Sequence, residues 1–232
     1  FQAEDGIRDL VRSRGLGDVY KRQEIATPRF QRVPNTKFEN AKLVKNKGEE
    51  LFIDGEGVIK NYNITEETTQ ETVVTKNGIF FPYLSSLYQV EGNTIKKYSI
   101  GTEDASEGAV WATDEEFSEA KDMAISVSIY VLTKNDSIIK YTSGTKDTRF
   151  SIKGLETGLR GAIKLDTNWD WKNMYVADAG NKRVVVLTKE GAFVKEIKPE
   201  NSSWDNLKGI AITENEKTLF VLDGTRVFEV GL

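Results

Sequence analysis

The sequence contains no cysteine and no histidine. Without thiols the chain can form no disulfide, no thiolate metal site and no cysteine nucleophile. Without imidazole it can form no Ser-His-Asp triad and no histidine-ligated zinc or iron site. The absence of cysteine is compatible with a reducing or an oxidising compartment. No run of about 18 apolar residues is present either, so the sequence predicts no membrane-spanning helix.

The chain is also poor in clustered positive charge. It carries 32 basic against 36 acidic residues, a formal net charge of −4. Proteins that bind nucleic acids rely on clustered lysine and arginine to contact phosphates, and no such cluster is visible. We therefore expect no nucleic-acid partner, and what remains is carboxylate chemistry or binding through surface side chains.

Short apolar runs separated by turns dominate the rest of the sequence. Met174–Ala177 is rich in strand-forming residues, and Val184–Leu187 is a continuous apolar run typical of a strand buried on both faces. Ala192–Ile197 alternates apolar and polar residues, as a half-buried outer strand does. Because three strands cannot bury both faces alone, this meander needs similar sheets as neighbours.

The same strand, turn and strand pattern recurs along the chain. An aromatic residue marks the second strand of each copy, at steps of 36, 42, 45 and 45 residues: Phe52, Tyr88, Tyr130, Tyr175 and Phe220. A repeat of roughly 40–45 residues with four short strands is typical of a β-propeller blade. The sequence predicts an all-β propeller of about five four-stranded blades. Part of a six-bladed ring and a β-sandwich with evenly spaced hairpins are the alternatives.

One copy carries a fuller motif. Tyr175–Leu187 contains an aromatic-Val strand, then Asp-x-x-Asn-x-Arg, then an apolar strand, and it resembles an NHL repeat. Its turn residues are Asp178, Gly180, Asn181 and Arg183. We expect Gly180 to supply a positive φ. We also expect Asp178 to accept hydrogen bonds from Arg183 or from the backbone of residues 181–183. The resemblance supports a propeller domain over residues 24–232.

The first 23 residues have a different character. Gln2–Asp9 and Ser13–Gln23 resemble translated adapter and read-primer sequences from DNA library preparation. We interpret residues 1–23 as adapter read-through outside the fold. Phe30–Val33 is predicted to be a strand that closes the ring as the outer strand of the last blade. A native N-terminus lost upstream would carry any signal or anchor, so membrane contact is expected only through it, and an extracytoplasmic location is favoured.

Three segments between the marker strands carry further expectations. Asp114–Lys121 is an acidic connection that can form a helix, and Arg149–Ile152 is predicted to be the outer strand of the third blade. A loop over residues 166–173 leads into the NHL-like copy.

Carboxylates at strand ends are candidate metal ligands. Asp54, Asp122 and Asp166 occupy repeated positions, together with Asp178. In lactonase-type propeller enzymes, carboxylates at the mouth of the channel hold calcium, so these residues would serve a propeller hydrolase. The structural alternative is that each aspartate bonds its own turn. We expect no cofactor, with calcium as the alternative.

The candidate ligand-binding residues are Trp169, Trp171, Arg160 and Arg183. The two tryptophans lie two residues apart in one loop, so in an extended loop both would point to one side. Exposed aromatics can bind a peptide or a sugar, whereas buried ones pack between blades. Since propellers present loops on a rigid face, we expect a non-catalytic binding, scaffold or sensor module for a protein or peptide partner. A carbohydrate-binding propeller is a further alternative.

Overall fold

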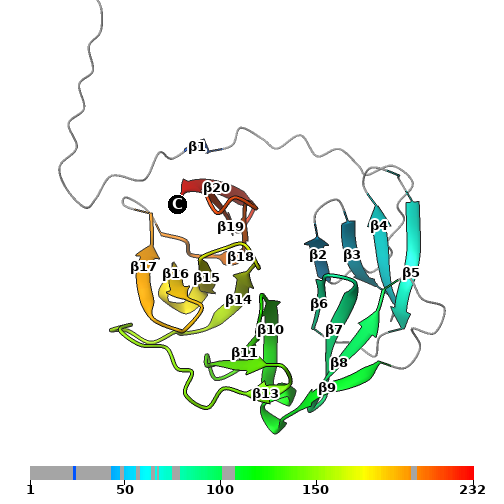
Figure 1. Cartoon of the computed structure of the whole chain (residues 1–232). Coiled ribbons are helices and arrows are strands. Elements are labelled where there is room, and N and C mark those ends of the chain that lie inside the picture. Colours follow the sequence, from blue (N-terminus) through cyan, green and yellow to red (C-terminus); the bar gives the residue numbers. More distant parts are fainter. Residues whose placement is uncertain are drawn as a thin grey trace, which may run out of the picture.

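In the part of the chain that the structure describes, five four-stranded antiparallel sheets form the blades of a β-propeller (Figure 1). The computed structural model describes residues 23–24, 43–47, 50–55, 58–63, 66, 68–74, 79–100, 108–199 and 203–232. Within this part of the chain, no helix is long and apolar enough to cross a membrane.

Each blade is a meander in which the first strand is innermost. The first blade contains β2 (Leu43–Lys47), β3 (Glu50–Gly55), β4 (Val58–Asn63) and β5 (Thr68–Val74). The second contains β6 (Phe80–Tyr83), β7 (Ser86–Glu91), β8 (Thr94–Ser99) and β9 (Ala109–Thr113). The 3-10 helix η1 (Glu115–Glu119) then leads to β10 (Ala120–Ile125), β11 (Ile129–Thr133), β12 (Ile138–Thr142) and β13 (Thr145–Lys146). The fourth contains β14 (Ala162–Thr167), β15 (Asn173–Asp178), β16 (Arg183–Thr188) and β17 (Phe193–Ile197), with η2 (Ala179–Asn181) inside it. The fifth contains β18 (Leu207–Ile212), β19 (Thr218–Asp223), β20 (Arg226–Gly231) and β1 (Gln23–Glu24).

The innermost strands follow one another around an axis. β2 lies next to β6, β6 next to β10, β10 next to β14, and β14 next to β18. Figure 1 shows the five sheets as an arc, with the first and the fifth blade at its two ends. The predicted blade order is confirmed.

The hydrophobic core lies between neighbouring sheets. The predicted marker aromatics face the following blade: Phe52 packs with the second blade, Tyr88 with the third, Tyr130 with the fourth and Tyr175 with the fifth. Four marker residues therefore occupy equivalent positions, as expected for a repeat in which each sheet covers the next.

Burial along the central strands reflects this stacking. All of β11 and nearly all of β16 is buried, because both strands have a sheet on each face. β19 instead alternates: Leu219 and Val221 pack against the fourth blade, whereas Phe220 is half-buried and Leu222 is exposed. This alternation is the signature of a strand with one well-covered face.

Three innermost strands contain a β-bulge near their first residue. A β-bulge leaves out Lys121 in β10, Ile163 in β14 and Lys208 in β18 when these strands pair with their neighbours. A bulge adds twist to a strand. Its recurrence at equivalent positions supports the interpretation of these blades as copies of one unit.

An N-terminal strand completes the last blade, as predicted, but a different segment provides it. Gln23 pairs with Glu229 and Glu24 with Phe228, so β1 is the outer strand beside β20. The expected closing strand, Phe30–Val33, lies outside the described residues, as do residues 1–22. Gln23, which we assigned to the adapter-like segment, is thus paired with the fifth blade.

The outer strand of the third blade was predicted wrongly. The chain turns directly after β12, through Ser143 and Gly144, which both have positive φ. The outer strand is therefore β13 instead of Arg149–Ile152. Lys153 bridges Ala192 in parallel, so this segment runs to the fourth blade. The 3-10 helix η1 confirms the helical connection predicted over residues 114–121.

Candidate functional site

In the second to fifth blades, the turns between the first and second strands lie at one end of the sheets, and we name this end the Trp169 face. It is formed by the turns β6–β7, β10–β11, β14–β15 and β18–β19. Three of the six exposed large hydrophobic side chains in the described part of the chain lie there: Leu84 (68% exposed), Val127 (67%) and Trp169 (59%). They occupy corresponding turns of three successive blades, so the apolar groups form a series along one face.

A pocket opens at the same end, near the axis, and we name it the axial pocket. Its volume is about 280 Å³. Its lining comes from the innermost strands and first turns of the second to fifth blades: Phe81, Pro82, Tyr83, Leu84, Ile125, Asp166, Thr167, Asn168, Trp169, Trp171, Ala211, Ile212 and Glu214. The pocket volume is slightly below the range of about 300–1,000 Å³ that is usual for small-molecule sites, so the pocket suits a side chain better than a large ligand.

The loop that presents Trp169 is held on one side by Lys189. The ammonium of Lys189 donates to the carbonyls of Asn168 (2.8 Å) and Trp169 (3.0 Å). The Lys189 carbonyl in turn accepts from the hydroxyl of Tyr130 in the third blade, at 2.9 Å. Burial lowers the pKa of Lys189. The loop position is thus fixed by two neighbouring blades.

Glu216 of the fifth blade holds the other side of this loop. Its carboxylate accepts from the backbone N–H of Lys172 (2.7 Å) and of Asn173 (2.9 Å), and from the Tyr175 hydroxyl (2.9 Å). Burial raises the pKa of Tyr175, and the hydrogen bond to Glu216 raises it further. Glu216 has a φ of 54°, a left-handed conformation that is uncommon for a residue other than glycine and is found at functional sites.

Loss of the Glu216 carboxylate should release the loop without unfolding the blade. In Glu216→Ala, we expect hydrogen exchange at the amides of Lys172 and Asn173 to become about tenfold faster or more, since hydrogen bonds to charged groups contribute about 1.5–3 kcal/mol. Exchange is measured by amide NMR. The exposed Glu156 provides the control, because Glu156→Ala should leave both amides unchanged; unaltered exchange in Glu216→Ala would rule out the clamp.

An extended loop would point both tryptophans to the same side, but the loop is bent and they point to different sides. The Asn168 side chain accepts from the Asp170 N–H (3.2 Å), which bends the chain between them. Trp171 is only 6% exposed, lies edge-on to Tyr175, and donates its indole N–H to the Glu214 carbonyl at 2.9 Å. Trp171 thus anchors the loop and Trp169 is its accessible aromatic.

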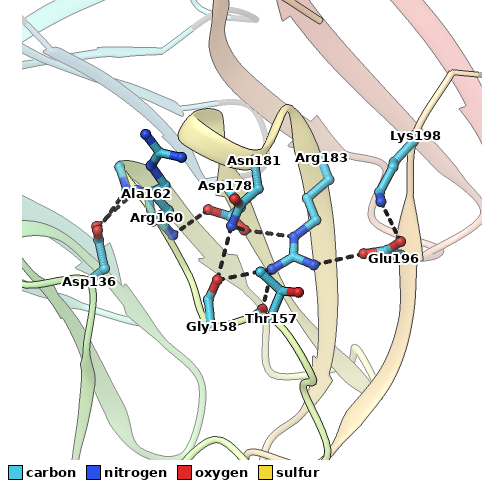
Figure 2. Close-up of polar contacts among 11 residues, drawn as sticks. Asp136, Thr157, Gly158, Arg160, Ala162, Asp178, Asn181, Arg183, Glu196 and Lys198 are labelled. Atoms are coloured by element: carbon cyan, nitrogen blue, oxygen red, sulfur yellow. Dashed lines mark hydrogen bonds and ion pairs between the residues drawn. The ribbon is translucent and has the colours of Figure 1, made fainter. Parts of the chain in front are cut away.

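The NHL-like turn lies at the opposite end of the fourth blade, where β15 ends and β16 begins. Figure 2 shows its polar contacts. The carboxylate of Asp178 is fully buried and accepts from the Arg183 guanidinium (2.7 Å), the Asn181 amide (2.9 Å) and the Arg160 backbone N–H (2.7 Å). The expected bond from Arg183 is therefore present. In the fifth blade, Asp223 accepts from the Asn206 N–H in the corresponding way.

Gly180 has a role in this turn other than the one expected. The residue with positive φ is Lys182, at 56°. A Cβ on Gly180 would lie 2.5 Å from the carbonyl oxygen of Arg160, to which the Gly180 N–H donates at 2.8 Å. Glycine is required here because two backbone segments touch.

The two candidate arginines both donate to Asp178, Arg183 through its guanidinium and Arg160 through its backbone N–H. Arg183 is 4% exposed and also contacts Glu196 (2.8 Å) and the carbonyls of Thr157 (2.5 Å) and Gly158 (3.1 Å). Although burial opposes it, the hydrogen bonds to Asp178 and Glu196 raise the pKa of Arg183. Arg183 thus holds the loop before β14, while the side chain of Arg160 is exposed.

The candidate metal ligands are dispersed. Asp122 is buried, accepts from the Leu165 N–H (2.9 Å) and lies 3.4 Å from the Lys164 ammonium, so it joins the third and fourth blades. Asp166 lines the axial pocket, and Asp54 lies in β3 of the first blade. Among the residues that the structure describes, no three carboxylates converge in a way that could hold a metal ion.

Sequence reasoning missed most of the Trp169 face. It singled out none of Leu84, Val127, Lys189 and Glu216. The signal available for Leu84 and Val127 was their place in corresponding turns of the repeat. The contacts of Lys189 and Glu216 to the loop span 20 and 44 residues of sequence, which no local pattern indicates.

Three comparisons place the chain among known proteins. No protein-family model matches it, and no curated protein matches it. Among solved structures, it resembles the computationally designed Ika8 protein (TM-score 0.52, 13% identity), BamB from Moraxella catarrhalis (0.51, 14%) and a protein of unknown function from Bacteroides thetaiotaomicron (0.56, 13%). At these identities the likeness shows the fold alone, that of a β-propeller.

The likeness extends over most of this chain but not of the others. The matches cover 82%, 87% and 88% of this chain, and 57%, 62% and 55% of the respective structures. The chain thus spans somewhat more than half the length of the structures it resembles.

Proposed function

We propose that this protein is a non-catalytic binding module that recognises a protein or peptide partner through the Trp169 face. The observation that carries the proposal is the placement of Leu84, Val127 and Trp169 on corresponding turns of three successive blades. Exposed apolar groups gathered on one face mark interaction sites, whereas singly scattered ones do not.

The support of the Trp169 loop adds to this proposal. An aromatic side chain contributes most to binding when it is already held in its bound conformation, because less conformational entropy is lost. Lys189 and Glu216 hold the loop on both sides, while the Trp169 ring itself stays exposed. Aliphatic tips such as Leu84 and Val127 suit a protein partner better than a sugar, which offers mostly hydroxyls.

A second, narrower proposal concerns the repeat type. We infer that the turn at Asp178–Arg183 is an NHL-type turn with a structural role. The burial of Asp178 and Arg183 and the bonds that tie them to residues 157–160 support this. The Trp169 face and this turn lie at opposite ends of the sheets, so binding and turn stability can be altered separately.

The binding proposal is tested by selecting displayed random peptides on the immobilised full chain. We expect enriched peptides that carry apolar residues. In Trp169→Ala their affinity should fall about 30-fold or more, because a hot-spot tryptophan contributes about 2 kcal/mol or more. Titration calorimetry with the synthesised peptides measures the change.

Val194 provides the matched control, since it is an exposed apolar residue on the outer strand β17. Val194→Ala should bind the selected peptides as the unaltered protein does. Peptides that bind equally well to Trp169→Ala, Val127→Ser and the unaltered protein would place recognition elsewhere and refute the proposal, as would a selection without enrichment.

A further inference from the structure

The axial pocket has an unusual combination of lining groups. Four aromatic side chains contribute to it, Phe81, Tyr83, Trp169 and Trp171. Two acidic residues, Asp166 and Glu214, also belong to the lining. No lysine or arginine occurs among the described residues of the lining.

This combination of lining groups favours the binding of a cation. An aromatic face carries partial negative charge and attracts ammonium or guanidinium groups, most strongly when the ring is that of tryptophan. Acidic residues in the lining of a partly enclosed pocket add Coulomb attraction that water screens less than at an open surface. The Glu214 side chain is exposed and Trp169 is 59% exposed, so both can be reached from solvent.

The pocket size restricts what this cation can be. A volume of about 280 Å³ has room for one long side chain. Of the two basic side chains, arginine fits the lining better. Its planar guanidinium can stack on an indole and pair with a carboxylate through two N–H groups at once, whereas the lysine ammonium is a strongly hydrated point charge.

We propose that the axial pocket receives an arginine side chain of the partner, whose neighbouring apolar residues contact Leu84 and Val127. The inference rests on the proposed function and states the chemical class of its partner: a peptide segment with arginine next to apolar residues. The carboxylates give specificity for the charge, and the apolar turns give the additional contact area.

The probe for this pocket is N-acetyl-argininamide, and its neutral isostere N-acetyl-citrullinamide is the reference. From the ligand efficiency of small molecules, we expect a Kd on the order of 1 mM for the arginine compound. Citrulline should bind at least about tenfold more weakly, since it lacks the charge. NMR titration follows the four indole N–H signals, of which that of Trp169 should shift and that of the buried Trp204 should not.

Two variants separate charge from stacking. Glu214→Gln should lower the affinity for the arginine compound about three- to tenfold and leave the affinity for the citrulline compound unchanged. Added salt should also lower the affinity for the arginine compound. Trp169→Ala should weaken both compounds. Glu156→Gln, at an exposed carboxylate outside the axial pocket, should change neither.

The outcomes distinguish this inference from the proposed function. If the selected peptides need Trp169 but lack arginine and bind Glu214→Gln normally, the binding face stands and the arginine pocket is refuted. If argininamide binds with the expected pattern while no peptide is enriched, the pocket stands and peptide recognition is refuted. Equal affinity for arginine and citrulline, or binding without a shift of Trp169, overturns the inference directly.

Discussion

Replacing Asp178 by alanine is expected to lower the free energy of unfolding by about 3–5 kcal/mol, because it leaves a buried guanidinium without its main partner. Asp178 is fully buried and Arg183 is 4% exposed, so water cannot replace the lost carboxylate. The backbone N–H of Arg160 would lose its acceptor as well. For a domain of this size, the melting temperature should fall by about 6–20 °C. Urea denaturation followed by tryptophan fluorescence measures the loss.

A double variant tests the cause of this loss. In Asp178→Ala/Arg183→Met the buried charge is removed together with its partner, so stability should recover in part relative to Asp178→Ala alone. The exposed Asp205, which pairs with Lys182 at the surface, provides the control, and Asp205→Ala should unfold as the unaltered protein does. An unchanged melting temperature in Asp178→Ala would show that the ion pair contributes nothing to the fold.

The blade architecture could be predicted because it depends on local patterns. A strand buried on both faces is apolar throughout, and four of the five marker aromatics, all except Phe220, have the same neighbour, the next sheet. Tyr130 and Tyr175 show this clearly, since both are buried between blades and both donate their hydroxyl to a turn of the following blade. Because the same packing recurs in these blades, the same apolar and aromatic pattern recurs in their sequences.

The outer strand of the third blade could not be predicted for a related reason. Phe150 and Ile152 are apolar because they pack on the core between the third and fourth blades, and the Phe150 ring lies 5.9 Å from that of Tyr130. Their alternation therefore reflects packing without ladder pairing. The true outer strand, Thr145–Lys146, is short and polar, and has no signal of its own.

The binding face was predictable only in part. Two tryptophans in one loop indicated that an aromatic would be presented there, but which one depends on Glu214 and Glu216 of the next blade. These contacts exist only once the sheets stack. The place of Leu84 in the binding face was harder to predict, because a single leucine in a turn indicates a binding face only together with the apolar residues in the neighbouring turns.

The second prediction concerns the turn Asp178–Arg183 of the fourth blade, where two substitutions should have different effects on the free energy of unfolding. Gly180→Ala is expected to destabilise the protein by about 1–3 kcal/mol, since its Cβ would lie 2.5 Å from the Arg160 carbonyl and force two backbone segments apart. Such a shift would also disturb the Arg160 N–H bond to Asp178. Thermal unfolding followed by circular dichroism measures the change.

Lys182→Gly is expected to be neutral or to stabilise by up to about 1 kcal/mol. Glycine relieves the left-handed backbone at Lys182, worth about 1–2 kcal/mol, and the greater freedom of glycine in the unfolded chain offsets about half of that. If Gly180 were instead the residue with positive φ, as its place in the motif suggests, Lys182→Gly would destabilise the turn by about 1 kcal/mol and Gly180→Ala would cause no steric conflict. The sign of the Lys182→Gly effect therefore decides whether this glycine serves backbone conformation or close backbone approach.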